Sequence, residues 1–372
     1  SVLLFFLGSG IWVALSMIGV SAIGMMLFTS RPVGDAMATT IWGTASSWTL
    51  TALPLFVWMG EILFRTKLSE NLFKGLSPWM QKLPGGLIHV NVVGCALFAA
   101  ISGSSAATVA TVGKMSIPEL RKRNYPEKIL LGSLAGSGTL GLLIPPSIIL
   151  IIYGVAVQES IAKLFIAGII PGIMIALIFM SYVIIWSLIN KKEMPKILEE
   201  YSFLEKIKRS KQLLPVILLI SAVIGSIYTG VATATEAASL GVVGALILSY
   251  FQKSLTLETF KSSLLGATKT SCMIAFILAG STFLSLAMGF TGLPRNLAIW
   301  IQGMELSPYV LILVLMIFYI ILGMFLDGIS AVVLTMAIIE PMIRQAGFDM
   351  IWFGIFLVIV VEMAQITPPV GF

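Results

Sequence analysis

Long apolar runs separated by short polar segments extend along almost the whole chain, and they predict membrane-embedded helices. The expected apolar helices cover residues 2–28, 50–64, 161–189, 213–230, 236–251 and 263–291. A Gly- and Thr-rich segment at 31–48 is expected at a membrane interface. Residues 67–83 place apolar and charged side chains at helical spacing, which predicts an amphipathic helix on the membrane surface. The pattern therefore indicates an all-α polytopic membrane protein.

Four breaks interrupt these apolar runs, and they form two pairs in the same order. A Gly/Ser break at Gly103 precedes a Pro-Pro pair at Pro145, and a break at Gly328 precedes a Pro-Pro pair at Pro368. The two glycines lie 225 positions apart and the two prolines 223, so nearly one offset relates both pairs. Proline removes an N–H group and leaves main-chain groups unpaired where lipid cannot satisfy them. Interrupted helices at matching places in two halves are typical of a transporter's binding site.

The repeat divides the chain into three parts. Residues 1–189 form the first predicted repeat, 190–211 a charged cytoplasmic linker, and 212–372 the second repeat. Lys and Arg are much more frequent beside the first Gly/Ser break than beside the second, and basic loops stay in the cytoplasm. The two repeats are therefore expected to be inverted relative to each other. The last break lies close to Phe372, so we also expect the natural sequence to continue beyond it.

Each repeat is predicted to contain a re-entrant hairpin followed by a broken helix. The hairpins are expected at 86–117 and 308–346, and the broken helices at 129–158 and 351–372. The arms of the first hairpin are too short to span a bilayer comfortably, as expected of a re-entrant segment. Hairpin tips that enter from opposite faces would meet the Pro-Pro breaks near the midplane and enclose one site.

Composition excludes several classes of protein. Hydrophobic residues make up 58% of the 372 positions and charged residues only 11%, which excludes a soluble globular domain. The net charge of +6 comes from Lys and Arg in short loops, so nucleic-acid binding is not expected. Cys95 and Cys272 lie in apolar runs and are expected to be buried and unlinked. Metalloprotease, serine-hydrolase and Walker motifs are absent from the sequence, so we expect a transporter driven by an ion gradient, with neither enzymatic activity nor a cofactor.

The first Gly/Ser break brings hydroxyl groups into an apolar setting. Helix ends there expose C=O groups, which attract a hard cation, and N–H groups, which attract a carboxylate. Neutral oxygens suit Na⁺ better than a transition metal. The alternative is that small residues allow close helix packing, but the recurrence of the break favours a site. The hydroxyl-bearing residues are Ser102, Ser104, Ser105 and Thr108. The candidate substrate-binding residues are Ser105, Thr108, Pro145, Pro146, Ser147, Gly328, Ser330 and Pro369.

Several acidic residues lie in or beside apolar sequence. Asp327 is expected to act near an ion, with helix capping as the alternative, and Glu362 faces the same choice. Glu236 has the spacing of a capping box and is expected to be structural. Glu61 is expected to pair with Arg65, one helical turn away.

These motifs, taken together, resemble those of a known family, and the likeness covers nearly the whole chain. The chain is similar to the large membrane (M) subunit of tripartite ATP-independent periplasmic (TRAP) transporters, which are grouped with the ion-transporter superfamily. One departure is Ala234, where family members typically have proline. The resemblance is carried by Ile144-Pro145-Pro146-Ser147, Thr367-Pro368-Pro369-Val370-Gly371, the run from Leu164 to Gly172, and Thr235-Glu236-Ala237-Ala238.

The resemblance implies a partner set and a mechanism. It implies a multi-pass protein of the bacterial inner membrane that works with a small four-helix membrane subunit and a periplasmic substrate-binding protein. It also implies elevator-type, Na⁺-coupled uptake of a small carboxylate such as a dicarboxylate or sialic acid. The Na⁺ sites that it implies correspond to Ser102, Gly103, Ser104, Asp327, Thr367 and Pro368.

Two other functions within the same superfamily stay open from the sequence. A stand-alone Na⁺/carboxylate symporter would need no binding protein. A Na⁺/H⁺ antiporter would need titrating acids at the midplane, for which Asp327 and Glu362 are available.

Overall fold

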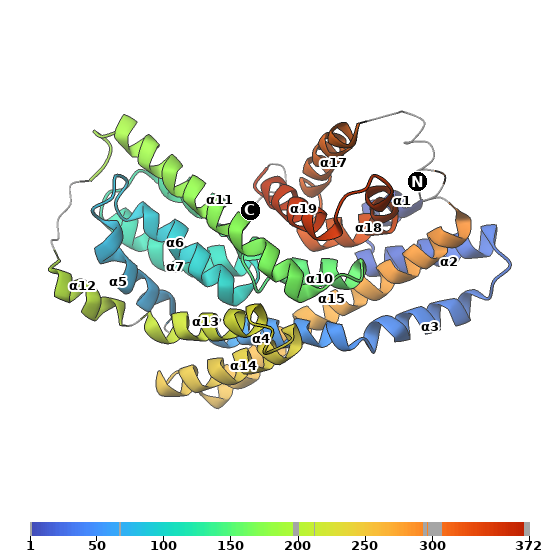
Figure 1. Ribbon diagram of the computed structural model, residues 1–372, viewed down its shortest axis with the longest axis horizontal. Coiled ribbons are helices and arrows are strands. Elements are labelled where there is room, and N and C mark those ends of the chain that lie inside the picture. The colour runs from blue at the N-terminus through green and yellow to red at the C-terminus, as the bar shows by residue number, and fades with distance from the viewer. Residues whose placement is uncertain are drawn as a thin grey trace. The chain divides into compact units, whose positions relative to one another are not determined.

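A computed structural model describes residues 2–66, 68–195, 201–211, 213–292, 296 and 307–367, and within these ranges all regular structure is helical. Figure 1 shows the helices in chain order. By length and composition, four helices can cross a membrane, or up to seven if each bent pair counts as one span. The four are α11 (Ile161–Ile189), α14 (Ala234–Phe251), α15 (Leu257–Thr291) and α18 (Gly328–Gln345). The protein is thus an all-helical, multi-pass membrane protein.

The helices pack into two compact units. Unit 1 comprises Ser1–Thr51, Ile149–Leu164 and Lys269–Gly371, and unit 2 consists mainly of Ala52–Ile148 and Phe165–Thr268. Each predicted repeat therefore contributes residues to both units. The division by packing does not coincide with the division by sequence repeat.

Unit 2 contains the first hairpin. Its arms pack against each other and against the two short helices that follow. In the same unit, α4 packs against α14 and against the first arm of the hairpin. The elements are α4 (Ala52–Phe64), α5 (Leu68–Met80), α6 (Ile88–Ser102), α7 (Ser105–Lys122), α8 (Glu127–Gly138), α9 (Leu140–Leu143), most of α11, α12 (Phe203–Ser210), α13 (Leu214–Tyr228), α14 and the start of α15.

Unit 1 contains the second hairpin. Its core includes Tyr153, whose hydroxyl donates a hydrogen bond to the Met350 carbonyl at 2.6 Å, and Tyr319, whose hydroxyl lies 2.6 Å from the Thr335 hydroxyl. The elements are α1 (Val2–Gly8), α2 (Val13–Phe28), α3 (Val33–Ala45), the 3₁₀ helix η1 (Trp48–Thr51), α10 (Ile148–Ala156), the larger part of α15, α17 (Pro308–Gly323), α18 and α19 (Met350–Gln365).

The second arms of the two hairpins have the same helix boundaries at an offset of 223 residues. This is the offset that separates the prolines Pro145 and Pro368 in the sequence. It relates both ends of α7 to both ends of α18, and the start of α8 to the start of α19. It also relates the prolines inside the second arms, Pro118 and Pro341, and the turn residues with positive φ, Asn124 and Gly347. The agreement supports the predicted internal repeat at the level of caps and turns.

Two expectations need correction. Residues 2–28 form two helices, because Gly8 ends α1 and Gly10 adopts a left-handed φ of +81° that a continuous helix does not allow. The amphipathic helix α5 buries its apolar face, including Leu72 and Leu76, against α6, α7 and α12 within the protein. The Gly- and Thr-rich segment forms the helix α3, and its expected place at a membrane interface stays a prediction.

The other predicted elements are present with small shifts. The broken helix appears as α8 and α9 followed by α10, with a bend of 41°, and α11 has the predicted bounds. The predicted span at 263–291 begins earlier, at Leu257. The end of the second broken helix, from Pro368 onward, lies outside the described residues.

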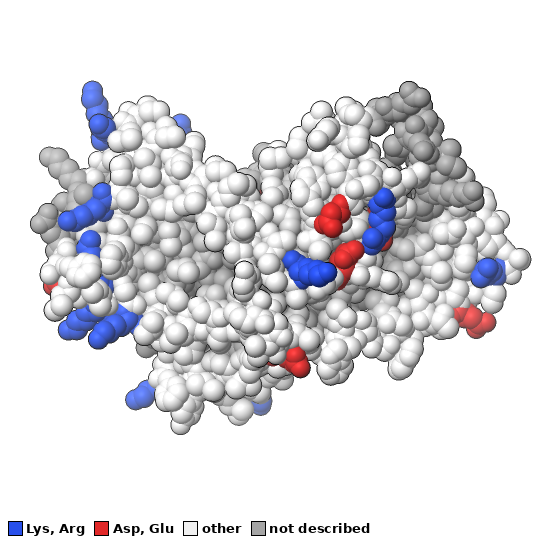
Figure 2. All heavy atoms as spheres, viewed as in Figure 1, with Lys and Arg blue, Asp and Glu red and all other residues white. Residues whose placement is uncertain are grey.

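Few charged atoms interrupt the surface shown in Figure 2, in keeping with a lipid-exposed protein. Lys and Arg gather at the end of unit 2 where α11 ends and α12 lies. The exposed basic residues of this region include Lys191, Lys192, Lys208 and Arg209. Positive loops of this kind favour the cytoplasmic side of a membrane, and the cytoplasmic location of the linker stays a prediction.

Candidate functional site

The tip of the first hairpin is a tight turn built on Gly103. The helix α6 ends at Ser102, and Gly103 adopts a left-handed conformation with φ of +59°. A Cβ atom on Gly103 would lie 2.7 Å from the Pro146 carbonyl oxygen, so only glycine fits between the tip and the Pro-Pro break. The Ile148 N–H donates to the Gly103 carbonyl at 3.3 Å. The predicted meeting of the first tip with the first Pro-Pro break is therefore observed within unit 2.

Hydroxyl and carbonyl oxygens cluster at this tip. The Thr108 hydroxyl donates to the Ser104 carbonyl at 2.8 Å and lies 2.8 Å from the Ser102 hydroxyl. The Ser104 hydroxyl caps α7 by accepting a hydrogen bond from the Ala107 N–H at 3.4 Å. The Ser105 hydroxyl donates to the Thr139 carbonyl at 3.3 Å. All these oxygens are neutral, which is the donor set that suits Na⁺.

Two further glycines allow other helices to approach the tip. A Cβ atom on Gly141 of α9 would lie 2.6 Å from the Ser104 carbonyl oxygen and 2.7 Å from the Ser105 Cα. A Cβ atom on Gly60 of α4 would lie 3.1 Å from the Ile101 carbonyl oxygen. Three elements thus enclose the tip at backbone distance. The sequence analysis did not assign a role to Gly141, because a glycine in an apolar run carries no local signal of what it faces.

At the first Pro-Pro break, a buried hydroxyl group forms a hydrogen bond to a main-chain carbonyl at the end of the preceding helix. The Pro145–Pro146 peptide bond is cis, and Ser147 is buried. The Ser147 hydroxyl donates to the Leu142 carbonyl, which would otherwise lack a helical partner because the chain leaves the helix. All eight candidate residues of the first half, from Ser102 to Ser147, therefore lie at or beside one turn.

The tip of the second hairpin is arranged in the same way around Asp327. The Asp327 carboxylate accepts a hydrogen bond from the Ser330 N–H at 3.1 Å and caps α18. The capping role, given as the alternative for this residue, is therefore present. Ser104 and Asp327 are equivalent caps, 223 positions apart.

The second tip packs against the helix that leads to the second Pro-Pro pair. A Cβ atom on Gly328 would lie 2.4 Å from Gln365 Nε2 and 2.8 Å from Val361 Cγ1. At the end of α19 the Thr367 hydroxyl donates to the Met363 carbonyl at 3.0 Å. Two candidates, Pro368 and Pro369, lie outside the described residues.

Three acidic residues outside the tips are an ion-pair partner, a helix cap and a buried side chain. Glu61 forms an ion pair with Arg65, as predicted. Glu236 forms a capping box with Thr233, also as predicted. Glu362 is buried in α19, three residues before the end of the helix at Gln365.

The two cysteines differ in exposure. Both thiols are free, and Cys95 is buried as expected. The prediction that Cys272 is buried was wrong, because this residue is exposed and lines a cavity. An apolar neighbourhood in the sequence does not distinguish the side of a helix that packs from the side that faces open space.

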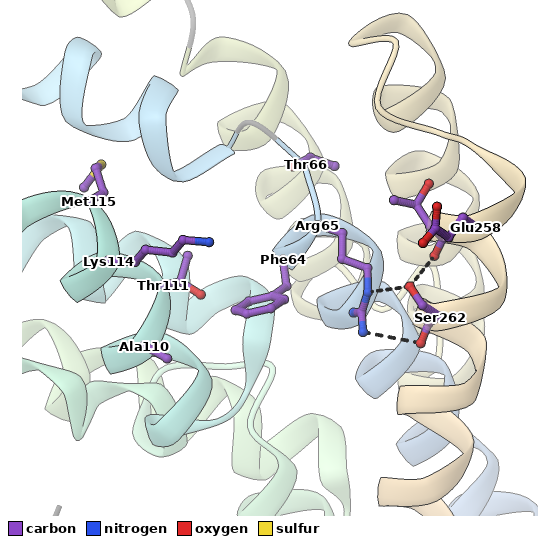
Figure 3. Close-up of a pocket in the computed structure, with 10 residues that line it drawn as sticks. Phe64, Arg65, Thr66, Ala110, Thr111, Lys114, Met115, Glu258 and Ser262 are labelled. Carbon is purple, nitrogen blue, oxygen red and sulfur yellow. Dashed lines mark hydrogen bonds between the residues drawn. The ribbon is translucent and has the colours of Figure 1, made fainter.

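A polar cavity of about 660 Å³ lies in unit 2 between α4, α7 and the start of α15. Figure 3 shows Lys114 extending from α7 toward Phe64 and Arg65 of the α4 end. The Arg65 guanidinium donates to the Ser262 hydroxyl at 2.9 Å, which ties α4 to α15. Among the predicted site residues that the structure describes, none lines this cavity.

A second cavity, of about 720 Å³, lies in unit 1 beside the second tip. Asp327 and Ser330 line it, together with Lys269 and Cys272 of α15. The sequence analysis passed over Lys269, although an ionisable residue in an apolar helix is itself a signal of function. Within the described ranges, no group of three or more His, Cys, Asp or Glu side chains could hold a metal ion.

The family model and similar known proteins point to the same family. Residues 1–372 match the family described as "Tripartite ATP-independent periplasmic transporter, DctM component". A C4-dicarboxylate TRAP transporter large permease protein of Pseudomonas aeruginosa is 33% identical over 94% of this chain and 81% of its own length. A sialic acid TRAP transporter large permease protein of Vibrio cholerae is 31% identical over 98% of this chain and 84% of its own length. In fold, the YdaH transporter of Alcanivorax borkumensis matches 99% of this chain and 88% of its own with a TM-score of 0.63, at 12% identity.

Proposed function

Because this chain belongs to the tripartite ATP-independent periplasmic transporter family as its DctM component, we propose that it takes up a small carboxylate by Na⁺ symport. The observation that carries the proposal is the pair of equivalent hairpin tips, each packed against the helix that runs into a Pro-Pro motif. Each tip gathers main-chain carbonyls and short polar side chains in an apolar setting. Neutral oxygens of this kind can hold Na⁺ at the first tip, and the Asp327 carboxylate adds a negative charge at the second.

The proposed Na⁺ ligands come from both tips. In the first tip they are the oxygens of Ser102, Gly103 and Ser104, and in the second tip those of Asp327 and Thr367, with Pro368 contributing from the second break. The substrate is proposed to lie against the residues that flank these sites. They are Ser105, Thr108, Pro145, Pro146, Ser147, Gly328, Ser330 and Pro369.

The membrane potential supplies the driving force. Each Na⁺ that enters gains about 2.3 kcal/mol per 100 mV, and each negative charge on the substrate loses the same amount. Two Na⁺ ions therefore drive a monoanion inward with a net charge of +1. A dianion would need three Na⁺ ions to keep that advantage.

The partner subunits follow from the family description and from the names of relatives. A tripartite periplasmic system implies a binding protein that delivers the substrate, and a large permease protein implies a small membrane subunit. The relatives named for C4-dicarboxylate and sialic acid both carry carboxylates, so a carboxylate is the proposed substrate class. The proposed location is the bacterial inner membrane, where a periplasmic binding protein can dock.

Alternating access is proposed to occur by an elevator motion. In this proposal the hairpins and broken helices carry the bound ions and substrate as a transport domain. The long apolar helices, including α14, form the scaffold against which they move. The turn at Gly103 favours the proposal because it joins the hairpin tip to the Pro-Pro break at backbone distance, so the two would move together.

Uptake by reconstituted vesicles tests the proposal. The chain, its small membrane partner and a cognate binding protein are placed in proteoliposomes with labelled succinate or sialic acid outside. We expect uptake only with an inward Na⁺ gradient and only with the binding protein present. Uptake without the binding protein would favour a stand-alone symporter, and Na⁺-driven proton efflux without substrate would favour an antiporter. Uptake that ignores Na⁺ would refute the proposal.

A further inference from the structure

The apolar cavity beside the second hairpin tip contains a cation that has no role in the function described so far. Lys269 lies in α15, one of the helices that can cross a membrane, and its side chain lines the cavity of about 720 Å³. We propose that Lys269 binds the carboxylate group of the transported substrate, an inference that rests on the proposed uptake function. The cavity would then hold the carbon skeleton of the same molecule.

The cavity is built from one face of α15 and two other elements of unit 1. Lys269, Cys272 and Phe276 all line it, and their spacing of three and four residues places them on one side of the helix. The rest of the lining comes from Trp12 to Ala14 at the start of α2 and from Asp327 and Ser330 at the tip of the second hairpin.

Two close contacts fix the elements that frame this cavity. A Cβ atom on Gly280 would lie 2.9 Å from the Ala14 carbonyl oxygen, so α15 and α2 touch at backbone distance. The Ser281 hydroxyl donates to the Val333 carbonyl of α18 at 2.6 Å. The cavity is therefore a packed feature of unit 1, and Lys269 is held at its wall by the helix that forms these contacts.

The charge of Lys269 needs an anion. Across the part of the chain that the structure describes, no hydrogen bond or ion pair engages its ammonium group. The other charged residue of the cavity, Asp327, has its carboxylate engaged with the Ser330 N–H. An unpaired ammonium in apolar surroundings is costly, so binding an anion there is favourable. A carboxylate supplies that charge, and the apolar residues that line the same cavity, such as Phe276, are available to the carbon skeleton of the molecule that bears it.

The same cavity gives a physical reason for coupling. Asp327 lines the same cavity as Lys269, and its negative charge opposes anion binding as long as no cation neutralises it. A Na⁺ ion at the Asp327 end would remove this repulsion and leave Lys269 unopposed. Cation binding at the tip would therefore strengthen anion binding at Lys269.

Cys272 provides a built-in reporter for the local charge. It is exposed, lies three residues from Lys269 on the same helix face, and differs from Cys95, which is buried. The test compares how fast an anionic and a cationic methanethiosulfonate reagent of similar size modify Cys272 in the reconstituted transporter. The modified peptide is quantified by mass spectrometry, so cysteines of partner subunits do not interfere.

We expect the anionic reagent to be favoured in the wild type, and the ratio of the two rates to fall by about tenfold or more in Lys269→Met. This is the order expected for unit charges about one helical turn apart at a dielectric constant near that of water, about 80, because Lys269 and Cys272 are both exposed. Lys269→Arg should keep the ratio. Lys261→Met is the matched control, because Lys261 is exposed on the same helix but does not line the cavity. A ratio that is unchanged in Lys269→Met would overturn the inference.

Replacing choline by Na⁺ at constant ionic strength separates this inference from the proposed function. If Na⁺ raises the ratio in the wild type, the cation and anion sites are coupled as proposed. If Na⁺ leaves the ratio unchanged while Lys269→Met still lowers it, the anion site stands and the proposed Na⁺ coupling through Asp327 fails.

Discussion

The close approach of α9 to the first hairpin tip predicts a large effect from a single methyl group. In Gly141→Ala the new Cβ would lie 2.6 Å from the Ser104 carbonyl oxygen and 2.7 Å from the Ser105 Cα. Both neighbours are backbone atoms, so neither can move away by a side-chain rotation. A carbon–oxygen contact needs roughly 3.3 Å, so the tip must shift by roughly 0.7 Å.

The size of the effect follows from that shift. Overpacking of a well-packed core by one methylene-sized group costs about 1–3 kcal/mol. The displaced atoms belong to the turn that is proposed to hold Na⁺, and a site must be held within about 0.5 Å to keep its affinity. We therefore expect Gly141→Ala to raise the half-saturating Na⁺ concentration for uptake by roughly tenfold or more, since each 1.4 kcal/mol is a factor of about ten.

The matched control is Gly132→Ala in α8. A Cβ atom on Gly132 would meet nothing within 4 Å, and an alanine in a helix interior stabilises it by about 0.5–1 kcal/mol relative to glycine. The melting temperature in detergent and the Na⁺ activation curve of uptake are measured for both variants. Equal melting temperatures and equal Na⁺ activation in the two would refute the packing of α9 on the tip.

Two further predictions concern packing within each unit. Arg65→Ala removes the ion-pair partner of Glu61 and the hydrogen bonds to α15. The free energy of unfolding should fall by about 2 kcal/mol, and the melting temperature should fall with it. A melting temperature equal to that of the wild type would show that the ion pair contributes little to stability. Tyr153→Phe removes a buried hydrogen bond to the Met350 carbonyl and should lower the free energy of unfolding by about 1 kcal/mol. Tyr250→Phe is its control, because Tyr250 is largely exposed, and equal stability of the two variants would contradict the role of the Tyr153 hydroxyl.

The architecture was largely predictable because the lipid environment restricts a chain to helices. The two breaks of each repeat were visible in the sequence, since proline and Gly/Ser interruptions are costly in a membrane and therefore specific. The structure adds that the caps Ser104 and Asp327 correspond at the same offset as Pro145 and Pro368. The sequence analysis gave an offset of 225 for the glycines and 223 for the prolines and did not choose between them, because it had no information on which residue capped the second arm.

Other features depend on contacts between distant segments, which one sequence does not contain. The close approach of Gly141 to Ser104 depends on how α9 folds back on the hairpin. The break at Gly10 was missed because the flanking residues are as apolar as a spanning helix. Lys269 was missed for a different reason, since a single charge did not change the overall apolar character of its segment.

The Na⁺ activation of uptake by Asp327→Asn tests the central claim most directly. Asparagine caps a helix as well as aspartate does, so the substitution removes the charge and keeps the bond to the Ser330 N–H. Asp349→Asn is the matched control, because Asp349 caps α19 in the same way and lies outside the proposed site. The account predicts that Asp327→Asn raises the half-saturating Na⁺ concentration, as Ser104→Ala does at the equivalent cap, while Asp349→Asn does not. Unchanged Na⁺ activation in both Asp327→Asn and Ser104→Ala would contradict it.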